Sequence, residues 1–331
     1  MSDSTASIAD IKRVVVAIKP RQRGLPLAAE HARLLARACD ASLLLVSAVF
    51  DGRVDASLER GDAAAAKARA RILDTERAEL ERLAGSLRDW GVAVETRAVW
   101  EAPAYAGILR AARDWKADLV VVGAHEPRAA ARTRLTDTDW QLMRQCACPL
   151  LLVKDPSFDG YPYVLAAIDP ALAHNEPSDL DEAVLAAAAG LARIFGSKLG
   201  VVHAFADPQE LGLTPVLNVG PGEYFDLADW AKLHRAATVA VAAPYGVAED
   251  SIVTAPGDPV DVIVDAVETA QAHLVVVGTA RRTPFMHALL GSTAEAVAAS
   301  VTCDVLLVPP PAASEAARPH AAAEATARPA S

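Results

Sequence analysis

The run LVVVG at residues 119–123 occurs again at residues 274–278, 155 positions later in the chain. At the same offset the apolar run at 150–153 is matched by another at 305–308. One constant offset across a strand-sized run, a loop, a helix-sized segment and a second run is a strong sign of an internal duplication.

The beginnings of the two copies also match. VVVAIKP at 14–20 aligns with VLAAIDP at 164–170, at an offset of 150. We therefore treat the chain as two repeats and predict strands separated by helices in each. The predicted strands lie near 13–19, 42–50, 92–99, 118–123 and 149–154 in the first repeat, and near 162–169, 198–205, 250–255, 273–278 and 303–308 in the second.

The runs at 119–123, 150–153, 274–278 and 305–308 are apolar throughout rather than alternating, so helices must cover both of their faces. The pattern predicts an α/β protein made of two tandem, doubly wound, five-stranded parallel sheets. In the first repeat we expect one long charged helix from about Leu58 to Trp90. The first helix of the second repeat shows helical periodicity, with an apolar face at Leu180, Val184, Ala188, Leu191 and Phe195.

Length and composition fit this organisation. A chain of 331 residues with 52% hydrophobic residues can build two cores of ordinary size. We place the first domain at 10–155 and the second at 161–310, joined by a turn-rich linker. From 311 to 331 the chain is rich in Pro and Ala, which predicts a disordered tail.

The net charge of -10 argues against direct binding to nucleic acid, since no Lys/Arg cluster compensates for it. The apolar runs are too short for a membrane helix, and no signal peptide precedes them. A soluble, cytoplasmic protein is expected. Four cysteines occur, at 39, 146, 148 and 303. They lack the second Cys pair of a zinc site, and we expect them to be buried, inert thiols.

Ligands of doubly wound sheets bind outside the carboxyl ends of the strands. After its fourth strand the second repeat reads Gly278-Thr279-Ala280-Arg281, and nine residues later Gly291-Ser292-Thr293 opens a helix. Glycine lets a ligand approach the backbone, and a helix start offers free N–H groups to an anion. This motif predicts a phosphate cradle, although a plain helix cap has the same appearance.

The two repeats resemble the universal stress protein family over nearly all of residues 10–310. Nucleotide-binding members carry G-x2-G-x9-G-[S/T] here, and the spacing from Gly278 to Ser292 matches except that Arg281 replaces the middle glycine. The resemblance implies the strand order 3-2-1-4-5. It also implies that an aspartate after the first strand faces the base and ribose, and Asp169 stands there.

The candidate nucleotide site therefore comprises Asp169, Gly278, Arg281, Gly291, Ser292 and Thr293. Two interpretations of Arg281 stay open. Its guanidinium could pair with a phosphate, or its bulk could fill the space that phosphates need. We expect weak ATP binding to be retained.

The first repeat departs further from the pattern. Lys19 replaces the aspartate, and Glu126 and Asp137 bring carboxylates to the place of the phosphates, so we expect no nucleotide there. His125, Asp137 and Asp139 are weak candidates for holding a divalent ion. Solvated surface charges, with Asp137 as a helix N-cap, are the favoured interpretation.

The chain lacks the P-loop, nucleophile-elbow and H-E-x-x-H motifs, so no dedicated enzyme is expected. A ligand-binding regulatory module of a stress response is favoured. One alternative is a sensor or carrier of an apolar ligand, with residues 211–225 as its lid. Another is an assembly protein without a ligand. Apolar edge strands need covering, so we expect the fifth strands of the repeats to pair in an intramolecular pseudo-dimer; a homodimer of whole chains stays open.

Overall fold

The computed structural model describes residues 11–21, 24–124, 135–154, 160–170, 178–206, 227–279 and 292–311. The first repeat contains, in chain order, β1 (Arg13–Ala17), α1 (Leu27–Cys39), β2 (Ser42–Val49), α2 (Gly52–Glu59), α3 (Ala63–Arg88), β3 (Val94–Trp100), α4 (Ala104–Asp114), β4 (Leu119–Gly123), α5 (Asp137–Gln145) and β5 (Leu150–Val153).

The second repeat follows the same plan. Its elements are β6 (Tyr163–Ala167), α6 (Asp179–Phe195), β7 (Lys198–Phe205), α7 (Leu227–Ala242), the 3-10 turns η2 (Ala243–Tyr245) and η3 (Glu249–Ser251), β8 (Ile252–Pro256), α8 (Pro259–Ala270), β9 (Leu274–Gly278), α9 (Ser292–Ser300) and β10 (Asp304–Val308). None of the described helices is both long enough and apolar enough to cross a bilayer.

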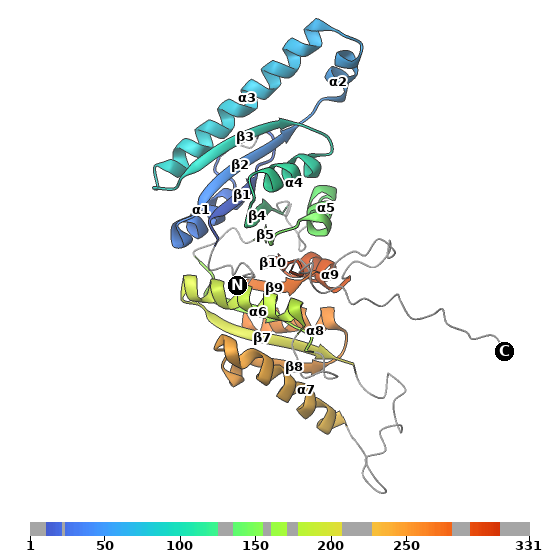
Figure 1. Ribbon diagram of the computed structural model, residues 1–331. Coiled ribbons are helices and arrows are strands. Elements are labelled where there is room, and N and C mark those ends of the chain that lie inside the picture. The colour runs from blue at the N-terminus through green and yellow to red at the C-terminus, as the bar shows by residue number, and fades with distance from the viewer. Residues whose placement is uncertain are drawn as a thin grey trace, which may run out of the picture.

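The strands form one continuous ten-stranded sheet in the order β3-β2-β1-β4-β5-β10-β9-β6-β7-β8. The first five give the predicted order 3-2-1-4-5, and the last five give it again in reverse. Within each repeat the described pairs are parallel, whereas β5 and β10 pair antiparallel. Figure 1 shows the two repeats meeting at these strands, with α3 and α7 toward opposite ends of the molecule.

Both faces of the sheet are buried, as the uniformly apolar strands predict. Side chains of α1, α3, α6 and α7 share one core with alternate residues of the strands. The other strand residues pack against α4, α5, α8 and α9. Val120, Val121 and Val122 therefore face alternate cores and stay at most 4% exposed.

The long helix predicted from Leu58 to Trp90 is divided into α2 and α3, so that prediction is wrong in part. Gly61 has φ +79, a left-handed conformation that interrupts the helix. Asp62 then restarts it, because its carboxylate accepts a hydrogen bond from the N–H of Ala64 at 2.8 Å.

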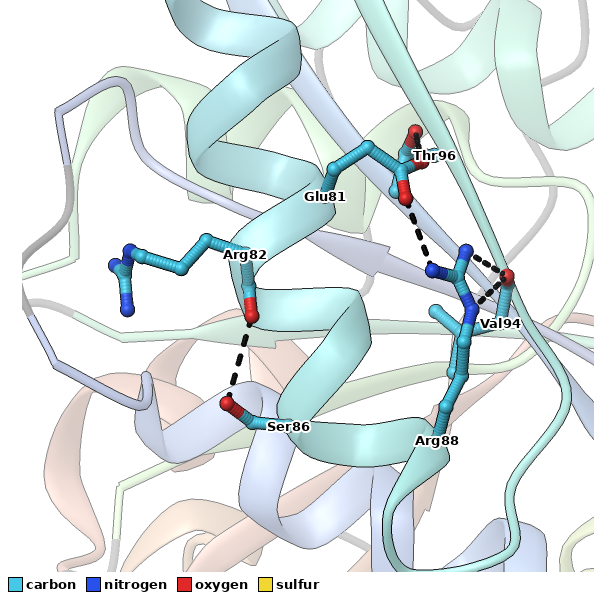
Figure 2. Close-up of polar contacts among 6 residues, drawn as sticks. All are labelled: Glu81, Arg82, Ser86, Arg88, Val94 and Thr96. Carbon is cyan, nitrogen blue, oxygen red and sulfur yellow. Dashed lines mark hydrogen bonds and ion pairs between the residues drawn. The ribbon is translucent and has the colours of Figure 1, made fainter.

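The end of α3 is fastened to β3 by polar contacts (Figure 2). The Arg88 guanidinium donates two hydrogen bonds to the Val94 carbonyl and a third to Glu81. The Thr96 hydroxyl donates to the other oxygen of Glu81 at 2.6 Å. These bonds lower the pKa of Glu81, with Arg88 as the largest cause. The hydrogen bonds of Arg88 and Thr96 hold α3 next to β3, although the side chains that form them are largely exposed.

A buried polar cluster ties the repeats together beside the β5–β10 pair. The Asp304 carboxylate, fully buried, accepts hydrogen bonds from the Tyr161 hydroxyl at 2.8 Å and the Lys154 backbone N–H at 2.7 Å. The Lys154 ammonium donates to the Val301 carbonyl at 2.8 Å and the Ala298 carbonyl at 2.5 Å, both near the end of α9. Burial lowers the pKa of Lys154 to about 8.

Candidate ligand site at the carboxyl edge of the second repeat

The strand order of the second repeat reverses between β6 and β9. β6 pairs with β7 on one side and with β9 on the other, so α6 and α9 leave neighbouring strands toward opposite faces of the sheet. Ala167 is in register with Val277, which puts Asp169 and Gly278 near the ends of adjacent strands. This is the topological switch point at which doubly wound sheets hold ligands.

Asp169 has a fixed backbone and a solvent-facing side chain. Its N–H donates to the carboxylate of Asp181 at 3.0 Å, while its own side chain is 93% exposed. Asp181 is buried in the first turn of α6, where Ser178 caps the helix and donates its hydroxyl to that carboxylate at 2.8 Å. The start of α6 thus fixes the backbone of Asp169 at the carboxyl end of β6.

Gly278 has a packing role that the sequence did not reveal. A Cβ at this position would lie 2.7–2.9 Å from three carbons of the Leu180 side chain. At the matching Gly123 of the first repeat, an added Cβ would come no closer than 3.8 Å to any neighbour, that of Ala28. A side chain at the end of β9 would therefore have to displace Leu180 of α6, whatever binds there.

Of the predicted cradle, the first turn of α9 is described. Ser292 begins the helix, Thr293 is half-buried and Ala294 is buried. Arg281 and Gly291 lie outside the described residues, as do His125 and Glu126 of the first repeat and the predicted lid at 211–225.

The corresponding helix start in the first repeat is capped by its own side chains. Thr136 is the N-cap, so the expectation that Asp137 would be the N-cap is wrong; Asp137 is the first helical residue and is exposed. The buried carboxylate of Asp139 accepts from the Thr136 N–H at 2.7 Å and from its hydroxyl at 2.8 Å. This reciprocal arrangement is a capping box.

The capping box uses one of the side chains that the sequence suggested as a metal ligand in the first repeat. Asp139 is turned inward and its carboxylate is occupied by Thr136. Among the described residues, no three His, Cys, Asp or Glu side chains gather closely enough to hold a metal ion.

A histidine pair lies next to Asp169. Nδ1 of His203, in β7, is 3.2 Å from the Ile168 carbonyl and 3.7 Å from the Asp169 carboxylate. Its Nε2 is 2.7 Å from Nδ1 of His234, in α7. The rings of His234 and Phe205 stack at 4.4 Å, and Trp230 meets His234 edge-on. Both histidines are buried. Their pairing could not be predicted from the sequence, since a lone histidine on a helix forms no recognisable motif.

The geometry assigns the ring protons. A carbonyl only accepts, so Nδ1 of His203 donates to Ile168 and its neutral ring accepts from His234 at Nε2. Nε2 of His234 is then an acceptor, and it is buried without a hydrogen-bond partner among the described residues. Burial, helped by His203, lowers the pKa of His234 to about 4, and burial lowers the pKa of His203 despite Asp169. Both rings are therefore neutral at pH 7.

Known proteins share the sequence pattern of both repeats. A family model described as "Universal stress protein family" matches residues 10–154 and 161–309, which together span most of the chain. The chain belongs to the universal stress protein family. This universal stress protein is 30% identical over 224 residues to universal stress protein E of Escherichia coli K12. The aligned region covers 66% of the chain and 69% of the relative.

Other relatives agree. The Haemophilus influenzae homologue of universal stress protein E is 24% identical over 66% of this chain and 71% of its own length. A Pseudomonas aeruginosa structure assigned to the universal stress proteins superimposes with a TM-score of 0.70 at 24% identity, covering 92% of this chain and 95% of that one. An Archaeoglobus fulgidus universal stress protein gives 0.61 at 13% identity, over 90% and 98% of the two chains. These structures support the fold alone.

Proposed function

We propose that this universal stress protein is a regulatory protein of the cytoplasm that binds a nucleotide, ATP in the first instance, in its second repeat. We further propose that it has no dedicated catalytic activity. The proposed site is the switch point between β6 and β9, with Asp169 on one side and the first turn of α9 on the other.

The observation that carries this proposal is the difference between the two equivalent helix starts. In the first repeat, the buried carboxylate of Asp139 fills the place of an anion at the start of α5. At the equivalent position of α9 stands Ala294, also buried, whose methyl group cannot accept a hydrogen bond. A helix start without an internal carboxylate keeps N–H donors and a favourable dipole for an external phosphate.

The other end of the crevice suits a sugar or a base. The exposed carboxylate of Asp169 accepts hydrogen bonds, as the family resemblance implies for a residue facing the base and ribose. Beside it, His203 and His234 are buried and neutral, so they bring no positive charge to this end of the site. The phosphates are thereby directed away from Asp169 and toward α9.

The proposal is tested by moving the first repeat's carboxylate into the second. Titration calorimetry of the full chain with ATP should show binding by the natural protein and at least about tenfold weaker binding by Ala294→Asp. The reason is that two like charges ~4 Å apart repel by ~4 kcal/mol at an effective dielectric near 20. The matched control, Asp139→Ala, removes the carboxylate from α5 and should leave ATP affinity unchanged.

Unchanged affinity in Ala294→Asp, with unfolding like that of the natural protein, would place the ligand elsewhere. Native mass spectrometry of freshly purified protein separates the remaining alternatives. A co-purified nucleotide supports the proposal, whereas a bound lipid would favour the apolar-ligand carrier. A bare chain that also fails to take up added ATP would favour an assembly protein.

A further inference from the structure

Two of the four cysteines are not fully buried, although the sequence suggested that all four would be. Cys39 and Cys303 are buried, whereas Cys146 and Cys148 are partly exposed on the turn between α5 and β5. Their sulfur atoms lie 3.7 Å apart, within contact distance. Cys146 and Cys148 pack against the core at one side only, because they lie on the turn before β5 begins at Leu150.

The turn borders a groove of about 530 Å³ along α4. Both thiols line it, together with Tyr105, Arg110, Arg113 and Lys116. Arg110 is paired with Glu101, so Arg113 and Lys116 leave the groove cationic. A small solute can therefore reach the sulfur pair, and two cationic side chains line the same groove.

The two thiols are chemically unequal. A hydrogen bond from the Cys148 thiol, together with the backbone N–H groups of Ala147 and Cys148, lowers the pKa of Cys146 against the effect of burial. The same hydrogen bond, with burial, raises the pKa of Cys148. Cys146 is thus the nucleophile of the pair, and Cys148 stands beside it as the resolving thiol.

We propose that Cys146 and Cys148 form a peroxide-reactive dithiol that closes reversibly into an intramolecular disulfide. The Cys146 thiolate attacks one oxygen of a hydroperoxide; an S–O bond forms, the O–O bond breaks, and the departing oxyanion takes a proton to leave as water or an alcohol. The Cys148 sulfur, having lost its proton, then attacks the sulfenic sulfur of Cys146. The S–S bond forms as hydroxide leaves and is protonated to water, and a thiol reductant restores both thiols.

The chain offers a direct measurement. Trypsin cleaves after Arg144 and Lys154, releasing residues 145–154 (QCACPLLLVK), which hold both cysteines and no other. After treatment of the full-length protein with a small excess of hydrogen peroxide and alkylation of free thiols, this peptide should appear two hydrogens lighter and unalkylated. Dithiothreitol before alkylation should return it to the doubly alkylated form.

Variants separate the roles of the two thiols. In Cys148→Ser, Cys146 should stop at the sulfenic acid and be trapped by dimedone, whereas Cys146→Ser should react at least about tenfold more slowly. Cys39 and Cys303, in the same chain, serve as buried controls that stay alkylatable only after denaturation. Natural protein that keeps both thiols, oxidises directly to sulfinic acid, or gives only disulfides between chains would overturn the proposal. The measurement is independent of nucleotide binding.

Discussion

Gly278 and Gly123 occupy the same place in the two repeats and have different surroundings. Leu180 of α6 lies directly over Gly278, while only Ala28 lies near Gly123, at a distance that a methyl group tolerates. The side chain that packs over each glycine, and not the LVVVG motif itself, therefore decides whether a larger residue fits there.

Replacing Gly278 with Ala should lower the free energy of unfolding by about 1–3 kcal/mol, because Leu180 must move to admit the methyl group. Gly123→Ala is the matched control and should change it by less than about 1 kcal/mol. Urea denaturation of the two variants compares them directly. Equal losses would show that the packing of Leu180 on β9 does not constrain residue 278.

The histidine pair predicts a pH dependence. Burial and His203 hold the pKa of His234 in the folded protein at about 4, below its ordinary value of 6.5. The unfolded chain therefore binds more protons than the folded chain in this window, and the stability present above pH 6.5 is lost as the pH falls toward 4. His203, which faces Asp169, shifts in the same direction.

In His234→Asn the side-chain amide can still donate to Nε2 of His203 but does not titrate. The variant should lose less stability between pH 7 and pH 5 than the natural protein does, as measured by urea unfolding at both pH values. Phe205→Leu, which keeps both imidazoles, is the control for lost stacking. Parallel pH profiles for the natural protein and His234→Asn would contradict the assignment.

Among the elements, α5 and α9 are equivalent helices of nine residues each with different beginnings. The sequence aligns them without a gap, yet the capping box is present in only one, since it needs Thr136 and Asp139 together. The same alignment puts Ala294 opposite Asp139. This difference is why the nucleotide proposal concerns the second repeat alone.

Thr136→Ala should destabilise the protein by about 1 kcal/mol, the usual effect of losing an N-cap hydroxyl. Thr138→Ala, two residues later in the first turn, is a matched control and should cost less. Thermal unfolding midpoints compare the two. A variant at 136 no less stable than the one at 138 would show that the capping box contributes little to α5.

In the whole molecule, the repeats are joined by more than the β5–β10 pair. Asp304 links Tyr161 and Lys154, and Nε2 of His31 in α1 lies 3.1 Å from its carboxylate. Arg144 of α5 also donates two hydrogen bonds to Glu295 of α9. Buried and partly buried charged side chains of one repeat thus have partners of opposite charge, or hydrogen-bond partners, in the other repeat.

Asp304→Asn should lower the free energy of unfolding by about 3 kcal/mol, because it removes the buried charge that faces Lys154 and His31. Asp74→Asn breaks an exposed ion pair with Arg77 and should change the free energy by less than about 1 kcal/mol. Calorimetric unfolding of both variants tests this. A loss at Asp304 no larger than at Asp74 would mean that the cluster does not hold the repeats together.

The strands could be predicted from the sequence more completely than the contacts of single side chains. The ten predicted strands account for every strand of the sheet. The central strands were clear because a strand covered on both faces is apolar at nearly every position, whereas β3, at the edge, also carries Glu95, Thr96 and Arg97. The long helix at 58–90 was wrong in part, since Gly61 could equally have stood inside a helix. Of the candidate site, Asp169 and the start of α9 were predicted at the carboxyl edge, whereas the pairing of His203 with His234 was not.

The amino-acid sequence by itself determined the duplication and the order of strands and helices. These features follow from periodicity, which is local. The tertiary structure alone decided that Leu180 covers Gly278, that Asp139 turns inward, and that Cys146 and Cys148 line an open groove. Such features depend on which residues, distant in the sequence, pack against each side chain in the folded protein. The spacing of residues along the chain does not predict those contacts.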